Sequence, residues 1–154
     1  MDIVDQYHDY LAIRQLRAPI PTRIRILSTL MSVNRGWKVI GITRAALEVF
    51  AQHNFKKVSH MGINRSHIIP RATTYTRMIS EPALPMHDWW DLYITSDNTI
   101  LATASENVTD RWSEVIPIDP DSDLFRGLNI GWRHNKQEIA FLRSIYETPD
   151  AATI

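Results

Sequence analysis

The chain of 154 residues contains no cysteine, which excludes disulfide bonds and zinc sites built from thiolates. It also has no run of about 18 apolar residues, the length that a helix needs to span a bilayer. The N-terminal residues lack the basic and apolar pattern of a signal peptide. From these absences we expect a soluble, cytoplasmic protein that has no membrane partner.

A net charge is also missing, because 17 Lys and Arg balance 17 Asp and Glu. The two signs are nevertheless separated along the chain. Residues 10–80 contain twelve basic residues and one acid, Glu48, whereas residues 81–125 contain ten acids and one basic residue, Arg111. A segregated basic half is typical of a protein that binds the phosphate backbone of a nucleic acid. The alternative is that the two halves pair with each other in the fold.

Length and composition predict one domain over residues 1–154, since 44% of the residues are hydrophobic and no repeat or linker interrupts the chain. Apolar residues at helical spacing predict helices over 2–17, 72–80 and 136–146. Two prolines end the first of these, and Thr22 and Thr43 are placed to cap the next two helices, which end near residues 31 and 53. These two helices also have a weak helix-turn-helix character, with Arg44 at the start of the second.

The most informative segment is Ser66-His67-Ile68-Ile69-Pro70. Asn98 follows His67 by 31 residues, and Asn107 follows Asn98 by nine. Residues 58–69 alternate well enough to predict a hairpin, and residues 99–103 form a short β-prone run. The following residues predict a helix capped by Thr103 or Ser105. The aromatic residues between 87 and 94 are expected in the core.

These residue types suit the cleavage of a phosphodiester bond. The attacking water must lose a proton while negative charge grows on the phosphate, so such a site needs one base and one cation. A neutral imidazole suits the base because its unperturbed pKa is near neutrality. An ion such as Mg²⁺ prefers oxygen ligands and retains several waters, so an Asn side-chain oxygen can help to hold it beside a phosphate.

The ordered His67, Asn98 and Asn107 resemble the three namesake residues of the HNH, or His-Me finger, nuclease family. The resemblance extends over residues 56–116. It implies an α+β fold in which a small ββα-metal core, in a variant without a zinc ribbon, is embedded in α-helices. A helical part, 1–55, would precede this core, a helical insertion would interrupt it, and a C-terminal loop and helix, 117–154, would follow it.

The family resemblance also implies a metal-dependent DNA endonuclease that uses Mg²⁺ or Mn²⁺. In this interpretation His67 activates water, Asn107 holds the ion and Asn98 braces the loop. Many family members have a metal-binding Asp where this chain has Ser66. The missing oxygen ligand would then come from Ser66 itself, from Asp110 one helical turn after Asn107, or from Asp88 or His87 in the insertion.

Basic residues around the motif are candidates for contact with DNA. Arg65 and Arg71 flank the His67 segment and would hold phosphate, Arg71 beside the scissile group. Three further candidates for nucleic-acid binding are Lys56, Lys57 and Arg44. Because one compact site cuts one strand at a time, double-strand cleavage would need a homodimer, for which Trp37 or Trp132 could serve.

Two other functional classes stay open at this stage. The first is a non-catalytic nucleic-acid-binding or regulatory protein on the same fold, with its metal site decayed at Ser66. The second is a helical interaction protein whose charged halves pair internally. Divalent-metal-dependent cleavage would distinguish the nuclease from the first class, and salt-sensitive DNA binding would distinguish the first class from the second.

Overall fold

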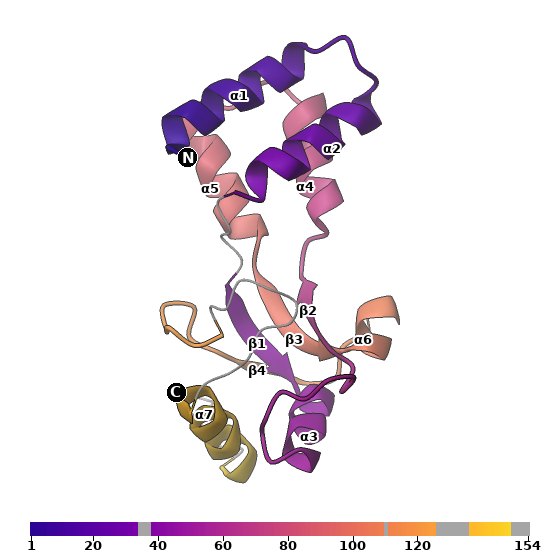
Figure 1. The fold of residues 1–154 in the computed structure, drawn as a ribbon, viewed down its shortest axis with the longest axis vertical. Helices are drawn as coiled ribbons and strands as arrows, with labels where there is room; N and C mark the ends of the chain where they lie inside the picture. The colour runs from indigo at the N-terminus through magenta and orange to yellow at the C-terminus, as the bar shows by residue number, and fades with distance from the viewer. Residues whose placement is uncertain (34–37, 110, 126–135, 149–154) are drawn as a thin grey trace. The chain divides into compact units, whose positions relative to one another are not determined.

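The computed structural model describes residues 1–33, 38–109, 111–125 and 136–148. These residues form an α+β protein with seven helices and a mixed four-stranded sheet (Figure 1). The chain divides into two compact units. Unit 1 comprises residues 1–37 and 67–98, and unit 2 comprises residues 38–66 and 99–154. In the described ranges no helix has the length and apolar character needed to cross a membrane.

Unit 1 is helical. Its elements are α1 (Ile3–Gln15), α2 (Ile20–Met31), α4 (Arg71–Ser80) and α5 (Met86–Ser96). Helix α2 packs against both α1 and α4, and α4 packs against α5. The helices predicted over 2–17 and 72–80 are therefore confirmed as α1 and α4. Asp2 caps α1 by accepting a hydrogen bond from the Val4 amide.

Proline residues mark where three of these helices begin. Pro19, Pro70 and Pro85 occupy the N-cap positions of α2, α4 and α5. The predicted cap at Thr22 is wrong, because α2 begins two residues earlier and Thr22 already lies in its first turn. The Thr22 amide donates to the Pro19 carbonyl at 3.0 Å instead. Prolines favour a helix start because their fixed φ suits the first turn and they carry no unsatisfied N–H.

The core of unit 1 is built around aromatic residues. Tyr10 and Trp89 are fully buried and stack with their ring centroids 5.3 Å apart. The Tyr93 hydroxyl donates to the Met31 carbonyl at 3.0 Å, and that of Tyr10 donates to the Met78 carbonyl at 3.2 Å. The hydroxyls of Tyr93 and Tyr10 thus each have an acceptor, as is usual for buried tyrosines. The expectation that the aromatic cluster is core is confirmed for Trp89 and Tyr93.

Unit 2 contains the sheet. Its strands are β1 (Val39–Thr43), β2 (Ile63–His67), β3 (Thr99–Thr103) and β4 (Val115–Pro117), in the order β2-β3-β1-β4. Strand β1 runs parallel to β3 and antiparallel to β4. The helices are α3 (Arg44–Gln52), α6 (Ala104–Thr109) and α7 (Lys136–Glu147), with α3 packed on β1, β3 and α7. Thr43 caps α3 through the Ala46 amide, as predicted.

The hairpin predicted over residues 58–69 is wrong, because only β2 forms within it. Strand β2 pairs with β3 instead, and the Ala104 amide donates to the Gly62 carbonyl at 2.7 Å beside this pair. His60 and Gly62 have positive φ angles of 61° and 70°. These left-handed conformations interrupt an extended chain, so the apolar alternation before residue 63 does not continue as a strand.

Strand β3 is almost entirely buried, and Leu101 at its centre is fully buried in the core of unit 2. Replacing Leu101 by Ala removes three buried carbon atoms and leaves a cavity, so we expect the free energy of unfolding to fall by about 3 kcal/mol. Urea unfolding measures this change. The matched control is Val108→Ala, whose side chain is 82% exposed and whose loss should cost less than about 0.5 kcal/mol. Equal effects of the two substitutions would contradict the placement of β3.

Candidate functional site

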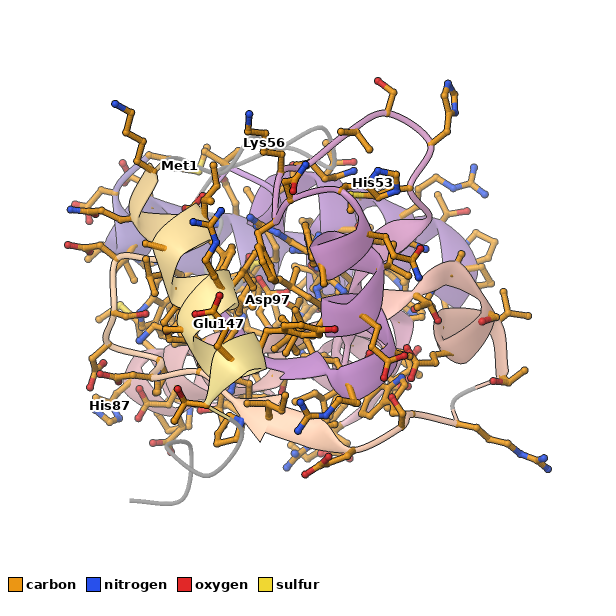
Figure 2. The ribbon with its side chains drawn as sticks, turned by 90° about the horizontal axis from the view of Figure 1, so that it is seen from below. Met1, His53, Lys56, His87, Asp97 and Glu147 are labelled. Carbon is orange, nitrogen blue, oxygen red and sulfur yellow. The ribbon has the colours of Figure 1, made fainter. Side chains whose placement is uncertain are left out.

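His67 is the last residue of β2, and its imidazole contacts a buried acid of the same unit, unit 1. The Nε2 atom lies 3.0 Å from Oδ1 of Asp97. The Asp97 side chain is 2% exposed, whereas that of His67 is 17% exposed. In Figure 2 Asp97 lies in the interior of the drawing and His87 lies at its edge. A partly exposed imidazole on a buried carboxylate is restrained but can still be reached by solvent.

The same carboxylate also binds Arg71, the first residue of α4. The Nε–H of Arg71 donates to Oδ1 at 2.9 Å, and its Nη2–H donates to Oδ2 at 3.1 Å. This is a bidentate pair, the strongest geometry for an arginine and a carboxylate. Asp97 follows the last residue of α5, where its own amide donates to the Tyr93 carbonyl. The cluster therefore joins the start of one helix to the end of the next.

The electrostatics keep Asp97 ionised. Burial alone raises the pKa of Asp97, but the hydrogen bonds from His67 and Arg71 and their charges outweigh burial and hold the pKa below its ordinary value. Burial lowers the pKa of Arg71, and the bonds to Asp97 reverse this and leave the pKa raised. Burial also raises the pKa of the neighbouring Tyr75, against the lowering effect of Arg71. The Tyr75 hydroxyl has no hydrogen-bond partner among the described residues.

Asn98 is half-buried and lies directly before β3. Its backbone carbonyl accepts a hydrogen bond from the Ile68 amide at 3.2 Å. Ile68 directly follows His67, and Asn98 directly follows Asp97. The backbone bond therefore holds the two segments together beside the contact between the His67 and Asp97 side chains.

The three predicted metal ligands have different surroundings. Asn107 is exposed on α6, and Asp110 lies outside the described residues. Ser66 is 2% exposed, and its hydroxyl has no partner in the described part of the chain. Its burial removes Ser66 as an accessible ligand. Within the described ranges no group of three or more His, Asp or Glu has the geometry to hold an ion.

Two of the arginines predicted to bind nucleic acid are engaged within unit 2. Arg65 donates through Nη2 to the Phe125 carbonyl, while Glu138 accepts from the Phe125 amide at 2.8 Å. Burial lowers the pKa of Arg65, and Glu138 opposes this. Arg44 forms an ion pair with Glu114 at 3.3 Å. Both arginines therefore have interactions inside the fold, and the partner of Arg65, Phe125, has a positive φ of 58°.

Of the two lysines in the loop after α3, Lys56 is exposed and Lys57 is half-buried. Lys56 is labelled in Figure 2. The tryptophans considered for a dimer, Trp37 and Trp132, lie outside the described residues. Among the described residues, four ion pairs join the basic stretch to the acidic stretch, and these are Lys38–Asp121, Arg44–Glu114, Arg71–Asp97 and Arg77–Glu81. Internal charge pairing thus accounts for part of the segregation.

Sequence reasoning missed Asp97, which is 2% exposed and binds both His67 and Arg71. It also missed Glu106, which is 8% exposed on α6. The signal for Glu106 was present, because Thr103 and Glu106 have the spacing of a capping box. The Glu106 amide donates to the Thr103 hydroxyl at 3.3 Å, and the Thr103 amide donates to the Glu106 carboxylate at 2.9 Å. The predicted cap at Thr103 is confirmed.

The Glu106 carboxylate also accepts hydrogen bonds from residues outside the capping box. Its Oε1 accepts from the amide and the hydroxyl of Ser113 at 2.8 and 2.7 Å, and its Oε2 accepts from the Thr43 hydroxyl at 2.8 Å. Burial raises the pKa of Glu106, but these hydrogen bonds outweigh it and lower the pKa to about 2. The carboxylate therefore connects α6 to the start of α3 and to the segment before β4.

No family model matches the chain, and no curated protein or solved structure matches it either.

The depressed pKa of Glu106 predicts a pH-dependent contribution to stability. Because the folded-state pKa lies below the unfolded value, the contribution is present above the unfolded pKa and is lost as pH falls toward the folded pKa. We expect Glu106→Gln to lower the free energy of unfolding at neutral pH by about 2 kcal/mol, because a charged acceptor of several hydrogen bonds is lost. The difference from the wild type should shrink between about pH 5 and pH 2.

Urea unfolding of both proteins over this pH range measures the difference. The control is Glu114→Gln, which removes an acid that is 69% exposed and should change stability by less than about 0.5 kcal/mol. If the free energy of unfolding of Glu106→Gln stays below that of the wild type by the same amount over the whole pH range, the role assigned to the ionised carboxylate is refuted.

Proposed function

We propose that the protein is a metal-dependent DNA endonuclease of the HNH type, which hydrolyses phosphodiester bonds. The observation that carries the proposal is His67 at the end of β2, with its ring held by a buried carboxylate. It is supported by the chain order that follows, in which Asn98 precedes β3 and Asn107 lies on α6. In this proposal β2, β3 and α6 are the two strands and the helix of a ββα-metal core.

His67 is the group that takes a proton. It accepts a proton from a water molecule whose oxygen forms a bond to phosphorus, and the bond from phosphorus to the leaving oxygen breaks. The leaving oxygen receives its proton from solvent. The 17% exposure of the His67 side chain gives water access to the ring, and its contact with Asp97 limits the ring's rotation.

Asn107 is the residue that would hold a divalent ion. Its exposed side chain offers one neutral oxygen, and the burial of Ser66 makes that residue a poor second ligand. This donor set fits Mg²⁺ or Mn²⁺ only if water and substrate phosphate supply the other ligands, which Mg²⁺ accepts readily. Such an ion, when bound, neutralises the negative charge that develops on the phosphate.

Contact with the DNA backbone is assigned first to Lys56, which is exposed. Arg44, Arg65 and Arg71 have interactions within the protein, so they contribute less to binding than their charge suggests. Binding to the phosphate backbone releases counterions, and the affinity should therefore fall as the salt concentration rises.

A second candidate is a nucleic-acid-binding protein that does not cleave. The observation that favours it is the ligand set, because Ser66 replaces an acid and is buried, and the described residues contain no three-ligand group. This candidate keeps the same contacts with phosphate but needs no ion.

Cleavage of supercoiled plasmid and single-stranded DNA with Mg²⁺ or Mn²⁺ tests the proposal. We expect His67→Ala to lower the cleavage rate by at least about 100-fold, because removal of a general base has effects of this size. Asn107→Ala should raise the metal concentration required for half-maximal cleavage. His8→Ala is the matched control, since this histidine is exposed on α1 and has no assigned role, and it should cleave like the wild type.

Cleavage that persists in EDTA, or that is unchanged in His67→Ala, would overturn the nuclease proposal. If the wild type shifts the DNA in a gel equally with metal and with EDTA, and no cleavage occurs, the protein belongs to the second candidate class.

A further inference from the structure

We propose that Asp97 is a positioning residue that sets the tautomer of His67, so that the hydrogen of the neutral ring is on Nε2 and the proton-accepting lone pair is on Nδ1. The catalytic consequence depends on the proposed nuclease function. The tautomer itself does not, because it follows from contacts within unit 1.

The carboxylate of Asp97 determines which ring nitrogen of His67 carries the hydrogen. An ionised carboxylate only accepts hydrogen bonds, and an arginine only donates them. Oδ1 of Asp97 lies 3.0 Å from Nε2 of His67 and 2.9 Å from Nε of Arg71. An Nε2 atom without a hydrogen would face this oxygen with its own lone pair, which is repulsive. The contact is therefore favourable only when Nε2 carries a hydrogen.

Arg71 ensures that the carboxylate stays ionised. It occupies both oxygens of Asp97, at 2.9 and 3.1 Å, in a place where the acid is 2% exposed. The resulting downward displacement of the Asp97 pKa agrees with this geometry. A protonated Asp97 would leave one donor of the Arg71 fork without its acceptor, which is costly in a buried place. Arg71 thus stabilises the ionised form of Asp97. The sequence had suggested that it contacts a phosphate.

The backbone fixes the three side chains at this spacing. His67 ends β2, Arg71 begins α4 and Asp97 caps α5, so each is at the end of a regular element. The hydrogen bond from the Ile68 amide to the Asn98 carbonyl joins the two segments next to the cluster. The imidazole is therefore oriented before any substrate arrives, which reduces the reorganisation needed in the reaction.

The first test measures the tautomer directly and needs no cleavage. Long-range ¹⁵N–¹H correlation spectra of the full-length protein, recorded where imidazoles are neutral, distinguish Nε2–H from Nδ1–H, and the spectrum of His67→Gln identifies the His67 signals. We expect the Nε2–H form in the wild type and a loss of this preference in Asp97→Asn. An Nδ1–H form of His67 in the wild type would overturn the proposal.

The second test is a double-mutant cycle on DNA cleavage. We expect Asp97→Asn to lower kcat about 10- to 100-fold with KM little changed, because the effect of a mispositioned base falls on the transition state. In the His67→Ala background the same substitution should cause no further loss. The exposed Asp91→Asn, whose side chain is 61% exposed, is the matched control and should cleave like the wild type.

The outcomes separate the two proposals. Additive losses from Asp97→Asn and His67→Ala would overturn the positioning role, since a residue that acts through His67 cannot add to its removal. If the wild type does not cleave DNA, the nuclease proposal fails, and the spectra of the wild type still decide the tautomer. If Asp97→Asn does not fold, the wild-type spectra decide it in the same way.

Discussion

The buried carboxylate of Asp97 is the interaction on which the candidate site depends. An ionised acid with 2% exposure is costly unless its oxygens are fully engaged, and here His67 and Arg71 supply the partners. Both partners come from the ends of other elements, so satisfying one acid also places the end of β2 and the start of α4. The need to neutralise one buried charge therefore restrains the imidazole to which we assign the chemistry.

A second buried acid has the corresponding role in unit 2. Glu106 faces inward and accepts from Thr43, Thr103 and Ser113, while its neighbour Asn107 is exposed on the same helix. A helix of six residues is too short to be stable alone. The carboxylate holds α6 by contacts with residues distant in sequence, and so it determines the position from which Asn107 would offer its oxygen. The proposed roles of His67 and Asn107 thus each depend on an acid that has no direct chemical role.

The segregation of charge along the sequence has two physical consequences. Part of the basic stretch pairs with the acidic stretch, through Arg71 with Asp97 and Arg44 with Glu114, and stabilises the fold. Arg65 is used in a different way, because it holds the backbone at Phe125. The proposed contact with DNA is therefore assigned to the exposed Lys56, and the total number of basic residues does not support it by itself.

Local sequence determined the helices, because capping residues, prolines and apolar spacing act within one or two turns. The cap at Thr43, the box of Thr103 with Glu106 and the limits of α4 and α7 all follow from such short-range interactions. Tertiary structure decided the rest. The pairing of β2 with β3, the burial of Ser66 and the contact of His67 with Asp97 join residues that are 30 or more positions apart or depend on packing. The sequence shows which residues are able to form such contacts. It does not show which contacts form, because burial determines which charges must be paired and burial depends on the tertiary structure.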